Sequence, residues 1–571
     1  MEKIWKIKES GNLVDDSETS KYHRVILELL AKRGISDPAE VERFFNSSYE
    51  RDILDPFLFS GMEKAVARIT EAKKKKEKIA VFGDYDADGV TATIILVETL
   101  EQLGFEKVIY YIPDRQLEGY GLNIEAIEYL QKEKVKLIVT VDCGITNLEE
   151  VAKAQALGMD IIITDHHHVP EKIPEALAVI NPHQKNSGYP FPDLAGVGVA
   201  LKLAEALYQK INPEKKEQLK WALDLAAIGT IADCVPLQGE NRVLAKYGLL
   251  VLSKTRRLGL QELFKVGSIQ IDADNVPNAR KIAFQVAPRV NAAGRMDHAN
   301  MAYELIRETD RVKARDLALE VESKNQQRQK VTAEIAKQVR LLAGSSFKDK
   351  KFIFAENEHW PVGILGLVAG KIAEEFGKPT AILQKQAKEI VGSFRSIPTV
   401  DIMEMLEKCQ ELLIRFGGHS QAAGVRLLSE NAKKFYEQME KNINAELAGR
   451  ELIPEIEVDL EIKPEDINWD LAMELKKLEP FGQGNEEPLF LMRRMAVMET
   501  KVVGNGNKHL KVQLRAENGG PKIFEAIGFR MGERKIPQNG EIIDLVFSLA
   551  EDEWNGNKKL QLTLVDFKKS I

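Results

Sequence analysis

The chain has 571 residues, of which 44% are hydrophobic and 29% charged, with a formal net charge of −7 at pH 7. At about 150 residues per domain, this length predicts three or four domains rather than one core. The acidic balance excludes a uniformly basic nucleic-acid-binding surface, so any nucleic acid would be bound through local basic patches.

The first residues and the cysteines indicate the compartment. The N-terminal sequence MEKIWKIKES carries charges where a signal peptide needs an apolar core, and no run in the chain reaches the roughly 18 apolar residues that span a bilayer. Cys143, Cys234 and Cys409 lie far apart and form no C-x-x-C pair, which is typical of a reducing compartment. We therefore expect a cytoplasmic protein with no membrane partner, in which residues 1–50 form an N-terminal extension.

Residues 77 to 182 alternate short apolar runs with amphipathic segments. The runs EKIAVFG, VKLIVTVDCG and MDIIITD are rich in β-branched residues, and helix-periodic segments separate them. This βαβ rhythm predicts a parallel sheet with helices on both faces, in which ligands bind at the carboxyl ends of the strands. The residues after 193 are helical, and we expect one α/β domain over residues 51–310.

Three further regions follow this domain. Residues 311–344 are rich in Lys, Arg, Gln and Glu with a thin apolar stripe, which predicts a long connecting helix. Residues 345–448 repeat the α/β pattern on a smaller scale. Residues 453–571 contain short alternating runs separated by Gly, Asn and Pro, which predicts a small β-barrel.

The stretch DYDADG, residues 84 to 89, matches the D-x-D-x-D-G pattern that begins an EF-hand calcium loop. Such a loop needs an acidic residue at its twelfth position, and counting from Asp84 that position is Ile95. An EF-hand loop also joins two helices, whereas DYDADG lies between a predicted strand and a predicted helix. The pattern therefore argues against calcium and leaves three carboxylates at the end of a strand.

Aspartates follow apolar elements at three other places: Asp142 in VTVDCG, Asp165 in IIITDHHH and Asp233 in GTIADCVP. A single aspartate of this kind commonly ends a strand or caps a helix. Several aspartates at one sheet edge would repel one another and raise one another's pKa values. Such a cluster is most stable when it binds divalent cations. Carboxylates with one or two imidazoles favour Mn²⁺ or Mg²⁺, and two such ions about 3.5–4 Å apart commonly hydrolyse phosphate esters.

These four motifs resemble the motifs of the DHH phosphoesterase superfamily. The resemblance implies two Mn²⁺ or Mg²⁺ ions, with Asp142 bridging both. It gives the first ion Asp84, Asp86 and Asp142, and the second ion Asp88, Asp142, His166 and Asp233. It also implies that His167 contacts the reacting phosphate and that Asp165 orients a neighbouring side chain.

Longer motifs are similar to those of the RecJ family of single-strand-specific 5′→3′ DNA exonucleases and cover nearly the whole chain. They include PDRQLEGYGLN (113–123), PRVNAAGRMDHA (288–299), SFRSI (393–397), RFGGHSQAAG (415–424), LEPFGQGNEEPLF (478–490) and WNGNKKLQL (554–562). The resemblance implies a monomeric enzyme that hydrolyses single-stranded DNA with a 5′ end to 5′-mononucleotides in recombination and repair. Its implied partners are a helicase and a single-strand-binding protein.

The same resemblance implies substrate contacts. Guanidinium forks suit a terminal phosphate, and the implied pocket for the 5′-phosphate consists of Arg115, Arg289, Ser393 and Arg395. Tyr120 would lie near the first nucleotide and help to exclude a second strand. The GGH of residues 417–419 (Gly417, Gly418 and His419) would hold the scissile phosphate against the metals.

Two histidines receive no role from the resemblance. His359 precedes Trp360, whereas the family pattern has the order W-H-x-G, and His168 lies outside the D-H-H motif. Lys501, Lys508, Lys511 and Arg515 of the C-terminal region are candidate contacts to a DNA backbone.

The resemblance implies an α/β fold class with four parts after the N-terminal extension. These are a parallel-sheet DHH domain (51–310), a long connecting helix (311–344), a smaller α/β DHHA1 domain (345–448) and a C-terminal OB-fold β-barrel (453–571). Two alternatives are a DHH phosphodiesterase of cyclic dinucleotides or short oligonucleotides and a non-catalytic DNA-binding replication scaffold. The first would not need the barrel, and the second would not need every metal-ligand position to be filled.

Overall fold

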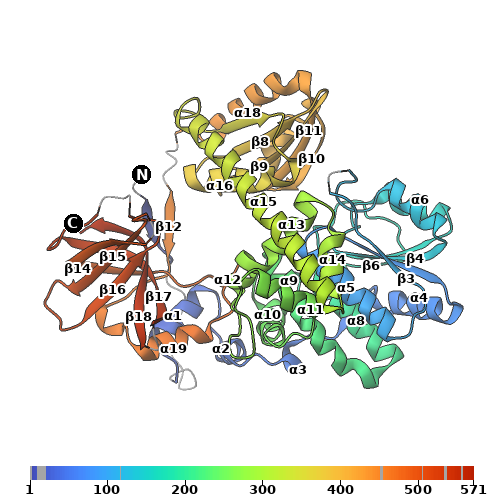
Figure 1. The fold of residues 1–571 in the computed structure, drawn as a ribbon, viewed down its shortest axis with the longest axis horizontal. Coiled ribbons are helices and arrows are strands. Elements are labelled where there is room, and N and C mark those ends of the chain that lie inside the picture. The colour runs from blue at the N-terminus through green and yellow to red at the C-terminus, as the bar shows by residue number, and fades with distance from the viewer. Residues whose placement is uncertain are drawn as a thin grey trace. The chain divides into compact units, whose positions relative to one another are not determined.

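The computed structural model describes residues 3–9, 21–115, 117–449, 454–504, 506–532, 536–554 and 557–570. The chain divides into two compact units, which Figure 1 colours by residue number. The larger unit comprises residues 54–235 and 239–453, and the other, here called the barrel unit, comprises residues 1–53, 236–238 and 454–571. Gln116, Asn555 and Gly556, which belong to the quoted motifs, lie outside the described residues.

The first sheet of the larger unit is fully parallel, as the sequence predicts. Its strands lie in the order β3-β2-β4-β5-β6. They are β2 (Lys78–Gly83), β3 (Val108–Tyr111), β4 (Val135–Val141), β5 (Asp160–Thr164) and β6 (Ala178–Ile180). The chain passes from β2 outward to β3 and returns to the other side of β2 as β4, so the strand order reverses between β2 and β4. In open parallel sheets, ligands bind at the carboxyl ends of the strands on either side of such a reversal.

Helices cover both faces of this sheet, as expected from the crossover connections. One face packs in a common core with α6 (Ile124–Lys132) and α7 (Leu148–Ala156). The other face contacts α4 (Met62–Lys75), α5 (Ala87–Gln102) and α8 (Gly196–Ile211). Helices α5 and α8 are buried on almost every side, in keeping with their apolar sequences.

The rest of the first domain is helical. Among the helices of the described ranges, none is both long enough and apolar enough to span a bilayer. The helices are α9 (Leu223–Ala232), α10 (Gly239–Leu252), α11 (Leu258–Val266), α12 (Ala279–Lys281), α13 (Ala287–Met296), α14 (Asn300–Arg307) and α15 (Arg311–Gly344). A π-helical turn, η3 (Ile282–Val286), joins α12 to α13. Helix α15 is the expected long helix, and Asp310 caps it by accepting hydrogen bonds from the backbone of its first turn.

A second sheet, of mixed direction, follows α15 (Figure 1). Its strand order is β10-β11-β9-β8-β7. The strands are β7 (Ile353–Asn357), β8 (Thr380–Lys385), β9 (Glu389–Arg395), β10 (Leu413–His419) and β11 (Ala422–Leu428). Helix α16 (Val362–Phe376) and the end of α15 cover one face, and α17 (Ile402–Glu407) and α18 (Ala432–Glu446) cover the other. This is the smaller α/β domain that the sequence predicts.

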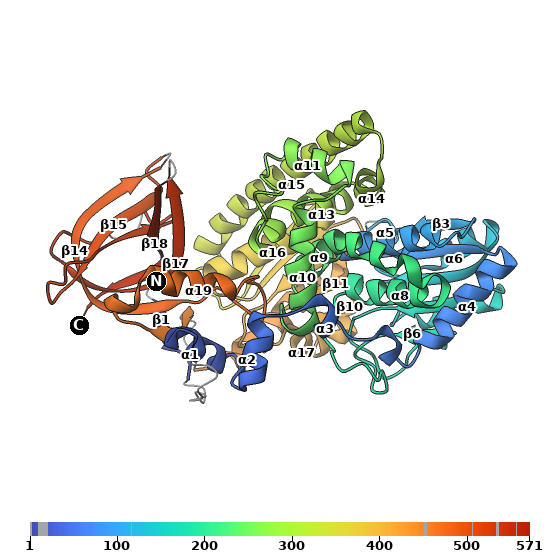
Figure 2. The same cartoon turned by 90° about the horizontal axis from the view of Figure 1, so that it is seen from below.

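The barrel unit contains the predicted small β-barrel (Figure 2). Strand β14 (Phe490–Val503) pairs with both β15 (His509–Ala516) and β17 (Ile542–Trp554), and β16 (Ile523–Gly528) and β18 (Asn557–Lys569) complete the ring. The short strand β13 (Leu460–Glu461) pairs with β14, and α19 (Trp469–Lys477) contributes to the core. A closed five-stranded barrel of this kind is the arrangement of an OB-fold.

The N-terminal residues pack onto the barrel. Strand β1 (Ile4–Ile7) pairs in parallel with β12 (Glu455–Val458), and the Trp5 indole N–H donates to Asp566 Oδ2 at 2.9 Å. Helices α1 (Arg24–Lys32) and α2 (Pro38–Phe45) bury their apolar faces in the same core as the barrel strands, and the short α3 (Tyr49–Asp52) follows them. The expected N-terminal extension therefore lies in the barrel unit, although about 400 residues separate the two segments in the sequence.

Truncation tests this packing. Removing residues 454–571 alone would leave the apolar side chains of α1 and α2 without their core, and each fully buried leucine that becomes exposed costs about 1.5–3 kcal/mol. We expect this protein to aggregate and to bind a hydrophobic dye, whereas a protein of residues 54–453 should be monomeric and should not bind the dye. Size-exclusion chromatography and dye fluorescence measure both, and equal behaviour of the two proteins would contradict the packing.

Candidate active site

Two of the predicted acidic positions lie at the point where the strand order reverses. Asp84 follows the last residue of β2, and Asp142 follows the last residue of β4, so both lie at the same edge of the sheet. Asp86 is the N-cap of α5, and its Oδ1 accepts from the backbone N–H groups of Asp88 at 2.9 Å and Gly89 at 3.1 Å. The ordinary capping role of Asp86 is therefore present, but it uses only one of the two carboxylate oxygens.

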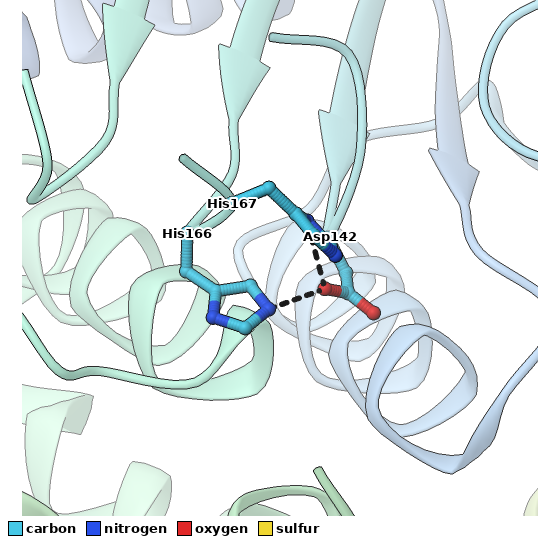
Figure 3. Close-up of side chains that lie close together, drawn as sticks. All are labelled: Asp142, His166 and His167. Carbon is cyan, nitrogen blue, oxygen red and sulfur yellow. Dashed lines mark ion pairs between the residues drawn. The ribbon is translucent and has the colours of Figure 1, made fainter. Parts of the chain in front are cut away.

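The D-H-H residues follow β5, the next strand along the edge. Asp165 is fully buried and accepts a hydrogen bond from the backbone of Ile145 at 3.0 Å. Its other oxygen lies 2.7 Å from Nδ1 of His167. Asp165 thus orients the His167 ring, which Figure 3 shows beside Asp142 together with His166.

The fourth acid comes from a helix. Asp233 is the C-cap of α9, and its Oδ2 lies 3.6 Å from Nε2 of His166. The same nitrogen lies 3.1 Å from Asp142 Oδ1 and 3.9 Å from Asp88 Oδ2. His166 therefore faces carboxylates from three separate elements.

The side chains form three groups whose ligand atoms are close enough to share an ion. The groups are Asp84, Asp86 and Asp142; Asp88, His166 and Asp233; and Asp142, His166 and His167. The first group contains the three ligands expected for the first ion, and the second contains three of the four expected for the second ion. The fourth, Asp142, has its Oδ1 3.1 Å from His166 Nε2. All six residues expected to hold metal are brought together at one edge of the sheet.

Three buried atoms at this edge have no hydrogen-bond partner within the described part of the chain. They are Asp84 Oδ1, Asp142 Oδ1 and His166 Nε2. A buried polar atom without a partner costs about 1–3 kcal/mol, and a cation would satisfy all three. Carboxylate oxygens with one imidazole nitrogen are a ligand set that suits Mn²⁺ or Mg²⁺, so the residues fit the expected metals.

Helix α8 approaches the acids so closely that its first residue must be glycine. A Cβ atom on Gly196 would lie 2.5 Å from Asp142 Oδ1, inside the contact distance of any real side chain. This close approach lets the N–H groups of Gly196 and Val197 donate to Asp88 at 2.7 and 2.9 Å. The positive end of the helix thereby holds the Asp88 carboxylate in place.

Burial and repulsion between like charges favour the neutral form of each group. They raise the pKa values of the acids and lower the pKa of His166. Burial, reinforced by the neighbouring carboxylates, raises the pKa of Asp84 and Asp142, of Asp88 to about 7 and of Asp233 to about 9. Burial, followed by the proximity of His167, lowers the pKa of His166 to about 3. Burial also opposes a charge on His167, but its hydrogen bond to Asp165 outweighs this effect and raises the pKa to about 9.

An arginine cluster lies beside the acids, and sequence reasoning identified only part of it. Arg115 lies over the ring of Tyr85 at 4.8 Å, and Arg395 donates to Ser393 Oγ at 3.2 Å. Arg295, at the end of α13, was not expected. Burial, followed by the proximity of Arg115 and other guanidinium groups, lowers the pKa of Arg295 to about 9. Such repulsion between like charges would be relieved by a bound anion.

Arg295 belongs to the quoted motif PRVNAAGRMDHA, which also contains Arg289 and Asn291. The structure pairs Arg289 Nε with Glu322 Oε2 of α15 at 2.6 Å, so its expected place in the phosphate pocket stays a prediction. Asn291 Oδ1 accepts from the backbone N–H of Ala87 at 2.7 Å and so fixes the loop that carries Asp86. The sequence motif therefore pointed to this region of the chain, but it did not single out Arg295.

Of the remaining residues singled out in the sequence, Tyr120 lies at the metal edge and His359 does not belong to the ligand groups. The Tyr120 hydroxyl lies 3.0 Å from His167 Nδ1 and donates to the backbone carbonyl of Asp142 at 3.2 Å, so Tyr120 supports the metal edge itself. Gly417, Gly418 and His419 end strand β10, and the His419 ring lies 5.5 Å from the ring of His168. The exposed His359 is not part of these groups.

The basic residues expected on the barrel are partly neutralised. Lys501 and Lys511 are cross-strand partners on β14 and β15, and they form ion pairs with Glu499 at 2.6 Å and Glu525 at 3.3 Å. Lys508 and Arg515 lie just before and within β15. A phosphate that contacts Lys501 or Lys511 would therefore compete with a neighbouring carboxylate for the ammonium group.

The raised pKa values predict how the metal-free protein responds to pH. A group such as Asp233, with a pKa near 9 when folded and about 4 when unfolded, contributes stability below pH 4 that is lost as the pH rises towards 9. Without metal, the melting temperature of the protein should therefore fall between pH 5 and pH 8.5. Scanning calorimetry after chelation should show a shallower fall for Asp233→Asn, because asparagine carries no charge at any pH.

Mn²⁺ provides the second half of this test. At pH 8, the ion should raise the melting temperature of the unsubstituted protein by several degrees and that of Asp233→Asn by much less. Equal pH slopes in the two metal-free proteins, together with equal effects of Mn²⁺, would contradict the pKa assignment of Asp233.

Comparison with known proteins places this site in a family. The family descriptions "DHH family, N-terminal domain", "DHHA1 domain" and "RecJ OB domain" match residues 78–230, 349–445 and 458–566. These matches fall on the parallel-sheet domain, the smaller α/β domain and the barrel.

Similar proteins extend the match to nearly the full chain. The single-stranded-DNA-specific exonuclease RecJ of Bacillus subtilis is 37% identical over 98% of this chain and 70% of its own length. RecJ of Haemophilus influenzae is 32% identical over 96% of both chains. The crystal structure of RecJ from Thermus thermophilus in complex with Mn²⁺ superposes with a TM-score of 0.84 at 28% identity, covering 100% of this chain and 80% of that one. The chain belongs to the RecJ family.

Proposed function

We propose that this protein is a two-metal-dependent 5′→3′ exonuclease that hydrolyses single-stranded DNA to 5′-mononucleotides in recombination and repair. The observation that carries this proposal is the set of three ligand groups at one sheet edge, two of which contain Asp142, beside a cluster of arginines. The relatives named as single-stranded-DNA-specific exonucleases, and the RecJ structures with Mn²⁺ and with Mg²⁺, support both the substrate and the metals.

The residues suggest how the work is divided. Two bound divalent ions would supply an activated water and neutralise charge on the leaving oxygen. His167, oriented by the Asp165 carboxylate that also favours its protonated form, would donate a hydrogen bond to the scissile phosphate. The backbone of Gly417 and Gly418, with His419, would hold the same phosphate from the second domain.

The arginine cluster would bind the 5′-terminal phosphate and thereby select the first nucleotide. Arg115, Arg295 and Arg395 converge there, with Ser393 as a hydroxyl donor. Planar guanidinium forks bind a phosphate dianion through paired hydrogen bonds, and the anion would offset their mutual repulsion. A terminal phosphate held one nucleotide from the metals would give a mononucleotide as the product.

Two further proposals concern partners and compartment. A helicase that opens the duplex and a protein that binds single strands would supply the substrate of a monomeric exonuclease. The enzyme would act in the cytoplasm, and its three free cysteines are in keeping with a reducing compartment.

The alternative functions fit the molecule less well. A phosphodiesterase of cyclic dinucleotides would have no use for the barrel unit, which matches the RecJ OB domain over residues 458–566. A non-catalytic scaffold would not need to preserve every metal-ligand position, yet every such position is filled here, and Asp84, Asp142 and His166 have buried atoms that a bound cation would satisfy.

The proposed activity predicts a substrate order. With Mn²⁺, the protein should release mononucleotides from the 5′ end of 5′-phosphorylated single-stranded DNA faster than from duplex DNA, matched RNA or a cyclic dinucleotide. Chromatography of end-labelled substrates measures this, and release from the 3′ end or a preference for the cyclic dinucleotide would refute the proposal. Asp142→Asn is the control, because Asp142 has φ +61°, which asparagine tolerates and alanine does not. We expect its turnover to be at least ~10³-fold lower.

The arginine cluster predicts a preference for a 5′-phosphate over a 5′-hydroxyl. Arg295→Gln removes the charged fork and leaves a shorter, neutral polar side chain, and it should raise KM for the phosphorylated oligonucleotide about 10–100-fold. KM for the 5′-hydroxyl oligonucleotide should change little. Arg289→Gln is the matched comparison, because Arg289 is already paired with Glu322. An equal loss of phosphate preference in both variants would show that the cluster extends to Arg289.

A further inference from the structure

Three imidazole rings lie in a row beside the metal edge, and two of them have no part in the function proposed so far. The ring of His168 lies 4.9 Å from the ring of His183 and 5.5 Å from the ring of His419. His168 and His419 are exposed, and His183 is half-buried. We call these three residues the histidine row.

Backbone contacts fix the row in position. Asn181 is fully buried, and its Nδ2 donates to the backbone carbonyl of His167 at 2.9 Å. Its Oδ1 accepts from the backbone N–H of His183 at 2.8 Å. The loop after β5, which carries His168, is thereby tied to the loop after β6, which carries His183. The buried amide of Asn181 therefore keeps the His168 and His183 rings close together although they lie on separate loops.

The order of strands gives the row its place relative to the substrate. Along the carboxyl edge of the sheet β3-β2-β4-β5-β6, Arg115 follows β3, Asp84 follows β2, and Asp142 follows β4. His168 follows β5, and His183 follows β6, the last strand. The edge therefore presents a phosphate-binding arginine first, the metal ligands next and the imidazoles last, with about 4.8 Å between neighbouring strands.

The second domain repeats this order. Arg395 on β9 pairs with Ala422 on β11, which pairs with His419 on β10, so Arg395 and His419 lie in one row across the sheet, two strands apart. His419 lies against His168 and Arg395 lies near Arg115, so both domains present arginine and then histidine in the same direction. A strand whose 5′-phosphate lies at the arginines and whose scissile phosphate lies at the metals would continue towards the histidines.

We infer that His168 and His183, which lie next to His419, form a subsite for the phosphodiester group that follows the scissile one on the 3′ side. The inference rests on the proposed function, because that function sets the direction of the strand. A ring N–H can donate to a non-bridging phosphate oxygen whether the imidazole is neutral or protonated. The subsite would hold the remaining strand in place while the first nucleotide is released.

The length of the substrate tests the subsite. The dinucleotide pTpT has a 5′-phosphate and a scissile phosphate but lacks the following phosphodiester, which pTpTpT has. The double variant His168→Ala/His183→Ala should raise KM for pTpTpT about tenfold, with kcat within twofold and KM for pTpT unchanged. His359→Ala, which removes an exposed imidazole of the same unit, is the matched control and should change neither.

A chemical substitution in the substrate isolates the contact. Replacing the second internucleotide phosphate of pTpTpT by a methylphosphonate should raise KM of the unsubstituted protein about tenfold for the diastereomer that loses the contacted oxygen. The same replacement should cost the double variant nothing further. An equal penalty in both proteins would overturn the subsite, as would an equal loss of affinity for pTpT and pTpTpT in the double variant.

Two additional measurements separate the subsite from product binding and from the proposed activity. If the double variant weakens only product inhibition by thymidine 5′-monophosphate, the row binds the product, and the inference fails. Equilibrium binding of fluorescent pTpTpT without metal tests the subsite independently of turnover. A methylphosphonate penalty on binding that disappears in the double variant supports the subsite even without turnover, and a penalty that persists overturns it.

Discussion

Repulsion among buried carboxylates is the constraint on which the larger unit depends. Asp84, Asp88, Asp142 and Asp233 come from three different kinds of position: the end of a strand, the first turn of a helix and the last turn of another. Packing them together raises their pKa values and leaves buried oxygens without partners. Cations resolve both problems at once, so the arrangement is stable in the form in which it can also catalyse hydrolysis.

This constraint extends into the surrounding packing. Helix α8 must begin at Gly196 because its N-terminus has to reach Asp88 while passing beside Asp142. Asn291 reaches the loop before α5 from a helix that lies about 200 residues later in the sequence. The acids are therefore held by contacts to helices on either side as well as by the strands, which limits how far they can separate when no metal is present.

The site combines a sheet edge that arranges groups in sequence with a second domain that repeats the arrangement. Parallel strands place one loop beside the next at regular spacing. Successive phosphates of a nucleic-acid strand can therefore contact successive loops along this edge. Arginines suit the terminal phosphate because it carries an extra charge, and imidazoles suit an internal phosphodiester because it carries one charge. The polarity of the strand order thus offers a structural basis for cleavage that begins at one end.

The sequence by itself determined the parallel sheet, the long helix, the smaller α/β domain and the barrel. Each is encoded by short-range patterns: alternation of strand and helix, a thin apolar stripe in a charged segment, and evenly spaced alternating runs. The six candidate metal ligands were implied by the resemblance of four short motifs to those of a known family, and the structure brings all six to one edge of the sheet. The fold predictions succeed where the physical cause lies within a few residues of the position concerned.

Only the tertiary structure brought Arg295 of PRVNAAGRMDHA close to Arg115 and paired Arg289 of the same motif with Glu322, because both contacts depend on how α13 packs against distant segments. It also decided that the N-terminal helices complete the core of the barrel, a contact between segments at opposite ends of the chain. The histidine row likewise needed the buried Asn181 to join two loops. Contacts of this kind leave no local pattern, since burial and charge pairing between distant segments are settled only when the chain has folded.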